Sequence, residues 1–167
     1  MIIGGFQPFS LSDFPGHIAA IVFTQGCNWR CHYCHNRLLL KRRRPEHELI
    51  PESYVLDILR LRRDDLDGVV ITGGEPTIQE DLSRFLREIR YLGLAVKLDT
   101  NGSRPDVLRC LLDEGLLDYV AMDIKGPFDQ YELIANSVVD TDALKTSLEV
   151  LENSGVPCEF RTPTVLR

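Results

Sequence analysis

Short apolar segments alternate with helical patterns along the chain, and this alternation restricts the fold more than any other feature of the sequence. Four segments are short, apolar and rich in β-forming residues: 18–24, 69–72, 95–98 and 119–122. Three segments between them carry apolar residues at helical spacing: 51–59, 82–89 and 105–112. Because strands that alternate with helices are joined by right-handed crossovers, we predict an α/β fold with one parallel sheet covered by helices.

The C-terminal part of the chain continues this pattern. Leu144, Leu148 and Leu151 indicate a further helix that ends at Gly155. The β-forming residues of segment 158–165 predict a fifth strand, although Pro163 interrupts it. With 167 residues, of which 44% are hydrophobic, the chain has the size and composition of one soluble globular domain. We therefore expect residues 1–167 to form a single domain.

Charge and hydropathy exclude several classes of function. The formal net charge of -6 gives no general attraction to nucleic acid or to an anionic membrane surface. The basic run at 41–44 is typical of a solvated loop. No apolar stretch approaches the roughly 18 residues that span a bilayer, and the N-terminus has no secretory leader pattern. We expect a cytoplasmic protein that binds neither nucleic acid nor membrane.

The most distinctive peptides all follow predicted strands. They are the segment 26–34 after the first strand, GGEP at 73–76, DTNG at 99–102 and DIKGP at 123–127. In parallel α/β sheets and barrels, ligands bind beyond the carboxyl ends of the strands. We therefore expect these four peptides to meet at one site.

Three of the five cysteines lie within eight positions, in the peptide GCNWRCHYCHN. This grouping favours a metal or cluster site over a disulfide framework. Cys27, Cys31 and Cys34 provide three thiolates, so a four-iron cluster would keep one iron open to an outside ligand. A structural zinc site is the less favoured alternative, because it needs a fourth ligand. The candidates for that ligand are His32, His35, Cys110 and Cys158.

The cysteine loop, with an aromatic residue before its third cysteine, resembles the signature of the radical S-adenosylmethionine (SAM) superfamily. GGFQPFSLSDFPG, TGGEPT, DTNG and MDIKGP are also similar to peptides of the anaerobic ribonucleoside-triphosphate reductase activating proteins. The resemblance spans nearly the whole chain. It implies a partial (βα) barrel in which Cys27, Cys31 and Cys34 are the metal ligands and catalytic residues, holding a [4Fe-4S] cluster whose open iron binds SAM.

The resemblance also implies a reaction and its partners. Reductive cleavage of SAM gives methionine and a 5'-deoxyadenosyl radical, which removes a Cα hydrogen from a glycine of a glycyl radical enzyme, such as anaerobic ribonucleotide reductase. Reduced flavodoxin or ferredoxin is the implied electron donor. In this reaction the cofactor supplies the chemistry, and the protein supplies binding and electrostatics.

The resemblance assigns eight residues to the binding of the cofactors. Gly73, Gly74 and Glu75 match the element that receives the amino group of SAM, and glycine permits close approach of a ligand to the backbone. Asp99 and Asn101 match the third-strand element, with a simple turn as the alternative reading. Asp123 and Lys125 are implied to face the ribose, a bound cation and the carboxylate of SAM. Tyr33 is placed to shield the cluster, as is Trp29, for which loop packing is an equal alternative.

Three other residues have weaker assignments. Arg161 could contact SAM, the partner's glycine loop or only a neighbouring carboxylate. Cys110, on the apolar face of a helix, and Cys158, at the start of a strand, are predicted to be packed thiols.

The chain departs from the family in one respect. The family's barrel has six strand–helix units, whereas we count five strands, so the domain is predicted to be truncated after the fifth strand and to leave an exposed edge there. Two other functions therefore stay open: a radical SAM enzyme that acts on a small molecule, and a non-catalytic cluster- or zinc-binding module.

Overall fold

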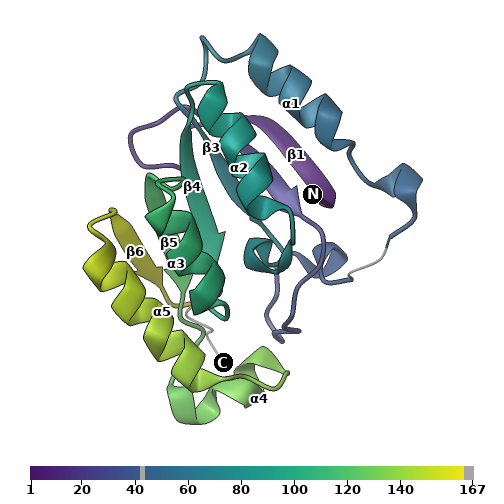
Figure 1. Cartoon of the computed structure of the whole chain (residues 1–167). Helices are drawn as coiled ribbons and strands as arrows, with labels where there is room; N and C mark the ends of the chain where they lie inside the picture. Colours follow the sequence, from purple (N-terminus) through teal and green to yellow (C-terminus); the bar gives the residue numbers. More distant parts are fainter. Residues whose placement is uncertain (42–43, 164–167) are drawn as a thin grey trace.

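The computed structural model describes residues 1–41 and 44–163, and the strands of this part form one six-stranded sheet (Figure 1). The strands are β1 (Ile3–Ser10), β2 (Ala19–Thr24), β3 (Gly68–Gly73), β4 (Ala95–Thr100), β5 (Tyr119–Asp123) and β6 (Cys158–Arg161), and they lie in this order across the sheet. β2 to β6 are parallel, and β1 pairs antiparallel with β2. The sheet is open, with β1 and β6 at its edges, as in a partial barrel. The predicted α/β fold with five parallel strands is therefore confirmed.

The helices follow the strands as the sequence pattern predicts. They are α1 (Glu52–Leu61), α2 (Leu82–Tyr91), α3 (Pro105–Asp113), α4 (Tyr131–Ala135) and α5 (Thr141–Ser154). Four 3-10 turns lie in the connections: η1 (Arg37–Leu39), η2 (Glu46–Glu48), η3 (Pro76–Ile78) and η4 (Phe128–Gln130). α5 is closed by Gly155 in the left-handed conformation, as predicted. The short α4 was not predicted, because five residues do not establish a helical period.

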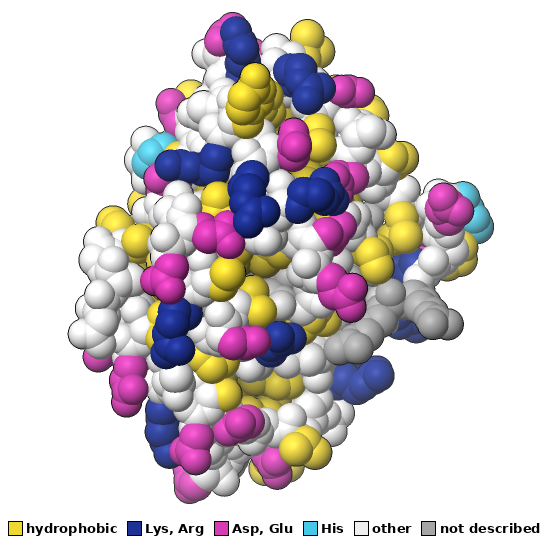
Figure 2. Space-filling view, in the orientation of Figure 1, with side chains coloured by type: hydrophobic (Ala, Val, Ile, Leu, Met, Phe, Trp, Pro, Cys, Tyr) yellow, Lys and Arg dark blue, Asp and Glu magenta, His cyan; other side chains and the backbone are white. Residues whose placement is uncertain are grey.

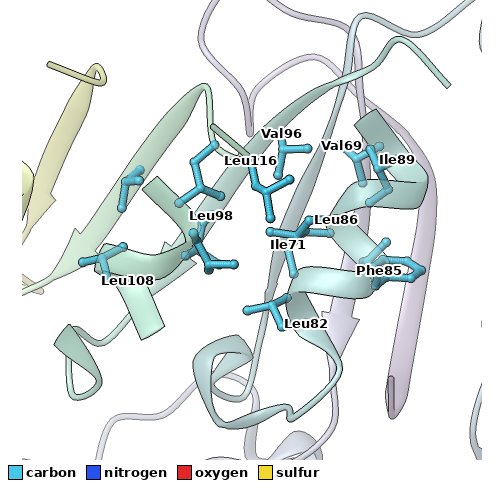
Figure 3. Close-up of a cluster of buried hydrophobic side chains, with 14 of the residues drawn as sticks. Val69, Ile71, Leu82, Phe85, Leu86, Ile89, Val96, Leu98, Leu108 and Leu116 are labelled. Atoms are coloured by element: carbon cyan, nitrogen blue, oxygen red, sulfur yellow. The ribbon is translucent and has the colours of Figure 1, made fainter. Parts of the chain in front are cut away.

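One face of the sheet packs against the helices and carries most of the core. Alternate residues of β3 and β4 point to this face, because successive side chains of a strand point in opposite directions. They contact the apolar stripe of α2, and Figure 3 shows the two sets interdigitated. The contacting residues are Val69, Ile71, Val96 and Leu98 from the strands and Leu82, Phe85, Leu86 and Ile89 from α2.

The opposite face, here called the inner face, has a second, smaller apolar cluster near the amino ends of the parallel strands. Phe14, which precedes β2, is buried there against Ile21 and Val70, and its ring lies 6.1 Å from that of Tyr119. Gly68 leaves room for Phe14, because a Cβ on Gly68 would lie 2.9 Å from the Phe14 ring. Side chains therefore fill the inner face at the amino ends of the strands.

Two strand predictions need correction. β1 was missed, because Gly4, Gly5 and Pro8 weaken a strand pattern; its position at the edge of the sheet tolerates them. The last strand ends at Arg161 and does not continue through Thr162. Pro163 has no backbone N–H and restricts the residue before it. The predicted continuation to residue 165 lies outside the described residues.

The surface seen in Figure 2 mixes basic and acidic side chains over the helices. Several charged side chains of the protein pair between elements, including Arg84 with Glu52 and Arg87 with Glu114. No helix within residues 1–41 and 44–163 combines the length and the apolar character that crossing a membrane requires.

Candidate active site

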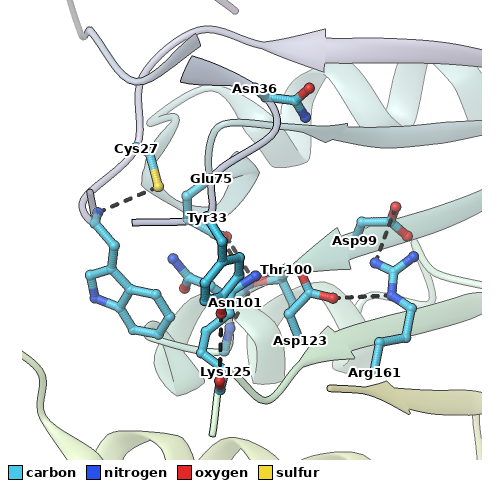
Figure 4. A network of polar contacts seen from close by, with 12 residues as sticks. Cys27, Tyr33, Asn36, Glu75, Asp99, Thr100, Asn101, Asp123, Lys125 and Arg161 are labelled. Atoms are coloured by element: carbon cyan, nitrogen blue, oxygen red, sulfur yellow. Dashed lines mark hydrogen bonds and ion pairs between the residues drawn. The ribbon is translucent and has the colours of Figure 1, made fainter. Parts of the chain in front are cut away.

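The four distinctive peptides meet around a cavity of about 350 Å³ at the carboxyl ends of the parallel strands. All eleven residues predicted for the site line it: Cys27, Cys31, Tyr33, Cys34, Gly73, Gly74, Glu75, Asp99, Asn101, Asp123 and Lys125. Asn36 and Leu40, after the cysteine loop, also line the cavity and were not expected there; His35, a candidate zinc ligand, and Thr100, within DTNG, line it as well. The arrangement therefore places thiols, carboxylates and an ammonium group around one space (Figure 4).

The cysteine loop is held at both of its ends. The backbone N–H groups of Gly26 and Cys27 donate to the carbonyls of Leu39 and Leu40, which closes the loop on itself. Gln25, buried at the end of β2, donates through Nε2 to the carbonyls of Leu38 and Lys41, at 3.1 and 2.6 Å. The loop is therefore fixed by backbone contacts that do not involve the thiols.

Trp29 anchors the middle of the loop to the unpredicted helix α4. Its side chain is buried, and its ring packs edge-on against Tyr131 at 5.5 Å. The backbone N–H of Arg30 donates to the carbonyl of Ala135 at 3.0 Å. Trp29 also lines the cavity. The loop-packing interpretation is therefore confirmed, and shielding of a cluster stays a prediction.

Burial keeps Cys27 and Cys31 in the thiol form in the protein without a metal. Burial raises the pKa of Cys27 to about 12, and burial also raises the pKa of Cys31. Since metals bind thiolates, occupation of the site must release these protons. Within residues 1–41 and 44–163, no three His, Cys, Asp or Glu side chains converge on a single point where one metal ion would fit. A four-iron cluster makes a different demand, because each of the three thiolates binds a separate iron, and three thiols spread along the wall of one cavity fit that demand.

Gly73 and Gly74 are required by close backbone contacts in the wall of the cavity, and the approach of a ligand to them stays a prediction. A Cβ on Gly73 would lie 2.3 Å from the backbone nitrogen of Thr24, and a Cβ on Gly74 would lie 2.0 Å from the carbonyl oxygen of Gly26. Gly73 also has φ of +117°, which other residues rarely adopt. The two glycines thus allow the loop after β3 to touch the start of the cysteine loop, so the close approach seen here is between two backbone segments.

Glu75 lies between the loops that follow β3 and β4. Its side chain is 1% exposed, and its carboxylate accepts hydrogen bonds from four donors. Thr77 donates through N and Oγ1 at 3.0 and 2.6 Å, Thr100 through Oγ1 at 2.7 Å, and Asn101 through its backbone N at 2.7 Å. Burial raises the pKa of this carboxyl, and the hydrogen bonds from its donors oppose that rise. The carboxylate thereby joins two strand ends that form the cavity wall.

Asn101 connects the β4 loop to the cysteine loop. Its Nδ2 donates to Oδ1 of Asn28 at 2.9 Å, and Asn28 donates in turn to Ser103 at 2.8 Å. Gly102 has φ of +74°, so it shapes the turn, as expected. The cysteine loop is thus braced by β3, β4 and α4.

Opposite charges alternate along the inner face at the carboxyl ends of β4, β5 and β6. Arg161 lies between two carboxylates, with its Nη2 3.3 Å from Oδ2 of Asp99 and its Nε 3.0 Å from Oδ1 of Asp123. Lys125 Nζ lies 2.7 Å from Oδ2 of Asp123. Burial opposes the charge of Arg161, but the two carboxylates outweigh it and raise its pKa. Of the three contacts considered for Arg161, the structure contains the one with neighbouring carboxylates.

Tyr33 closes one side of the cavity, and its hydroxyl donates to the carbonyl of Lys125 at 3.5 Å. Burial raises the pKa of Tyr33, so its hydroxyl is neutral.

The prediction for Cys110 is wrong: its side chain is exposed and its thiol lies 3.4 Å from Glu114, because it sits at the edge of the apolar stripe of α3. Cys158 is half-buried and packs against the core, as predicted.

Comparisons with known proteins agree with this architecture. The model of the radical SAM superfamily matches residues 21–166. A relative from Methanocaldococcus jannaschii, named "Putative glycyl-radical enzyme activating enzyme", is 34% identical over 98% of this chain and 68% of its own length. A relative from Thermococcus kodakarensis, named "Probable GTP 3',8-cyclase", is 31% identical over 80% of this chain and 42% of its own length.

Solved structures agree on the fold. The structure of anSMEcpe with bound AdoMet superposes with a TM-score of 0.58 at 21% identity, covering 81% of this chain and 40% of that one. At this identity the likeness concerns the fold alone. The superfamily match covers most of the chain, including the cysteine loop and the carboxyl ends of all five parallel strands. The chain therefore belongs to the radical SAM superfamily.

Proposed function

We propose that this protein cleaves SAM reductively with a [4Fe-4S] cluster held by Cys27, Cys31 and Cys34, and that it installs a glycyl radical on a partner enzyme. The observation that carries the proposal is the single cavity lined by the three cysteine thiols and by the charged ends of β4, β5 and β6. The M. jannaschii relative supports the glycyl radical partner. Anaerobic ribonucleoside-triphosphate reductase is the partner that we favour, and reduced flavodoxin or ferredoxin is the electron donor.

The cluster, when bound, supplies the electron that breaks a sulfur–carbon bond of SAM. The residues of the protein bind SAM and orient it. Asp99, Arg161, Asp123 and Lys125 form a row of alternating charges, here called the charged row. Lys125, at its end, suits the SAM carboxylate. Asp99 and Asp123 can accept hydrogen bonds from ribose hydroxyls. Backbone carbonyls at Gly73 and Gly74 suit the amino group of SAM, while Glu75 holds that loop in place.

We further propose that residues 1–167 act as one radical SAM domain in the cytoplasm, where thiols stay reduced. The continuous sheet from β1 to β6 supports the proposal of a single domain. The cavity between the cysteine loop and the charged row needs no contribution from a second domain to bring the eleven site residues together.

A second candidate is a radical SAM enzyme that acts on a small molecule, and the T. kodakarensis relative favours it. One experiment separates the two. Reconstituted, reduced protein and SAM are mixed anaerobically with candidate glycyl radical enzymes, and the glycyl radical is sought by EPR. We expect a radical on the reductase that appears only when SAM is present. Formation of 5'-deoxyadenosine with a nucleotide substrate, and no radical on any protein, would instead favour the second candidate.

A further inference from the structure

Lys97 is a buried charged residue that lies beneath the cavity wall. It is on β4, two residues before Asp99, so both side chains point to the inner face of the sheet. Its side chain is 2% exposed. Nζ lies 2.8 Å from Oδ1 of Asp99, 3.7 Å from Oε1 of Glu159, and 5.8 Å from the centre of the Tyr119 ring. Lys97 therefore meets the cavity only through Asp99.

The contact fixes the orientation of the Asp99 carboxylate. Oδ1 of Asp99 faces Lys97, and Oδ2 faces the guanidinium of Arg161. Each oxygen has a different cationic partner, so rotation of the carboxylate would break both contacts. Arg161 then continues the row to Asp123. The orientation set by Lys97 thus extends along the row of charges that borders the cavity.

Stability alone gives little reason for a lysine at this position. Burial of an ammonium group is costly, and apolar residues of similar volume often replace buried ion pairs without loss of stability. The same face of the sheet carries an apolar cluster that includes Ile21 and Val70. An apolar side chain at 97 would be compatible with such neighbours, but it would leave Oδ1 of Asp99 without a cation.

We propose that Lys97 is a positioning residue for the SAM pocket: it orients Asp99 and, through Arg161, the rest of the charged row. This inference rests on the proposed function. It predicts that loss of the Lys97 charge weakens SAM binding while the cluster still forms, because the cysteine loop is braced by β3 and α4 through contacts that do not involve Lys97.

The test measures the dissociation constant of SAM by anaerobic equilibrium dialysis on reconstituted protein, with iron content determined in parallel. The variants are Lys97→Met, Lys97→Arg, Asp99→Asn and the double variant Lys97→Met/Asp99→Asn. Lys145→Met is the matched control, because Lys145 is exposed on α5 and pairs with Asp142. Lys97→Gln, which keeps a donor without the charge, replaces Lys97→Met if the latter does not fold.

We expect Lys97→Met to weaken SAM binding by about 10- to 100-fold with unchanged iron content. Lys97→Arg should recover part of the loss, and the double variant should bind SAM no more weakly than Asp99→Asn alone. Wild-type affinity in Lys97→Met or Lys97→Gln, or additive losses in the double variant, would overturn the inference and leave the proposed function intact. Failure of the wild-type protein to bind SAM would overturn both.

Discussion

Replacement of Glu75 by Gln tests the contact that joins the loops after β3 and β4. The carboxylate accepts four hydrogen bonds, three at Oε1 and one at Oε2. In Glu75→Gln, the amide oxygen can keep the three donors from Thr77 and Thr100. The amide nitrogen then faces the backbone N–H of Asn101, and two donors cannot bond to each other. The reverse orientation is worse, because the nitrogen would face three donors.

The expected cost follows from that single lost contact. A buried N–H without an acceptor costs about 1–3 kcal/mol, so Glu75→Gln should lower the free energy of unfolding by about that amount. Glu75→Ala should cost more, since the backbone N–H groups of both Thr77 and Asn101 lose their acceptor. Urea unfolding of the metal-free protein measures the change as a shift of the midpoint at constant slope.

Glu80→Gln is the matched control, because Glu80 is exposed on the same connection. It should leave the midpoint unchanged. Equal midpoints for wild type, Glu75→Gln and Glu75→Ala would show that the carboxylate does not hold the two loops together.

Three further predictions concern the cysteines, the support of the loop and a charge at a helix start. Cys34→Ala should abolish formation of 5'-deoxyadenosine, whereas Cys110→Ala should leave it nearly intact; equal losses would refute the ligand assignment. Tyr131→Phe removes a hydroxyl that accepts from a backbone N–H at 2.9 Å, and it should lower the free energy of unfolding by about 1 kcal/mol in urea. The hydrogen bond from Arg104 holds the pKa of Asp106 below its usual value. Ionised Asp106 therefore stabilises the folded protein at any pH above the usual pKa of an Asp, and this stabilisation is lost as the pH falls through the lowered pKa. Asp106→Asn should therefore cost about 0–1 kcal/mol at pH 7 and nothing at a pH below both pKa values, and a cost that persists in acid would contradict this.

The parallel sheet and the place of the site were predictable from the sequence, because both follow from local patterns. Apolar segments such as 69–72 and 95–98 are typical of strands buried on both faces of a parallel sheet, and parallel strands bring their carboxyl ends to one edge. β1 was not predictable in the same way. Gly4 and Pro8 hide its pattern, and its pairing with β2 is decided by tertiary contact.

Roles that depend on side-chain partners also escaped the sequence. The motif that contains Glu75 predicts a contact with a ligand, which stays a prediction, but it does not indicate the donors from Thr77, Thr100 and Asn101. The last two lie about 25 residues away, at and just after the end of β4. The two glycines before Glu75 also lie against the backbone of the cysteine loop, a contact that the sequence does not reveal, and their approach to a ligand stays a prediction. The role of Lys97 could not be inferred from the sequence, because a lysine within an apolar strand can be interpreted only when its partners are known.

The proposed chemistry requires that three thiolates hold a four-iron cluster with one iron open to SAM. EPR spectra of the reconstituted, reduced protein before and after addition of SAM test it most directly, together with iron and zinc analysis of the same sample. We expect close to four irons per chain and a cluster signal that SAM changes. One zinc per chain without iron, or a four-iron signal that SAM leaves unchanged, would contradict it.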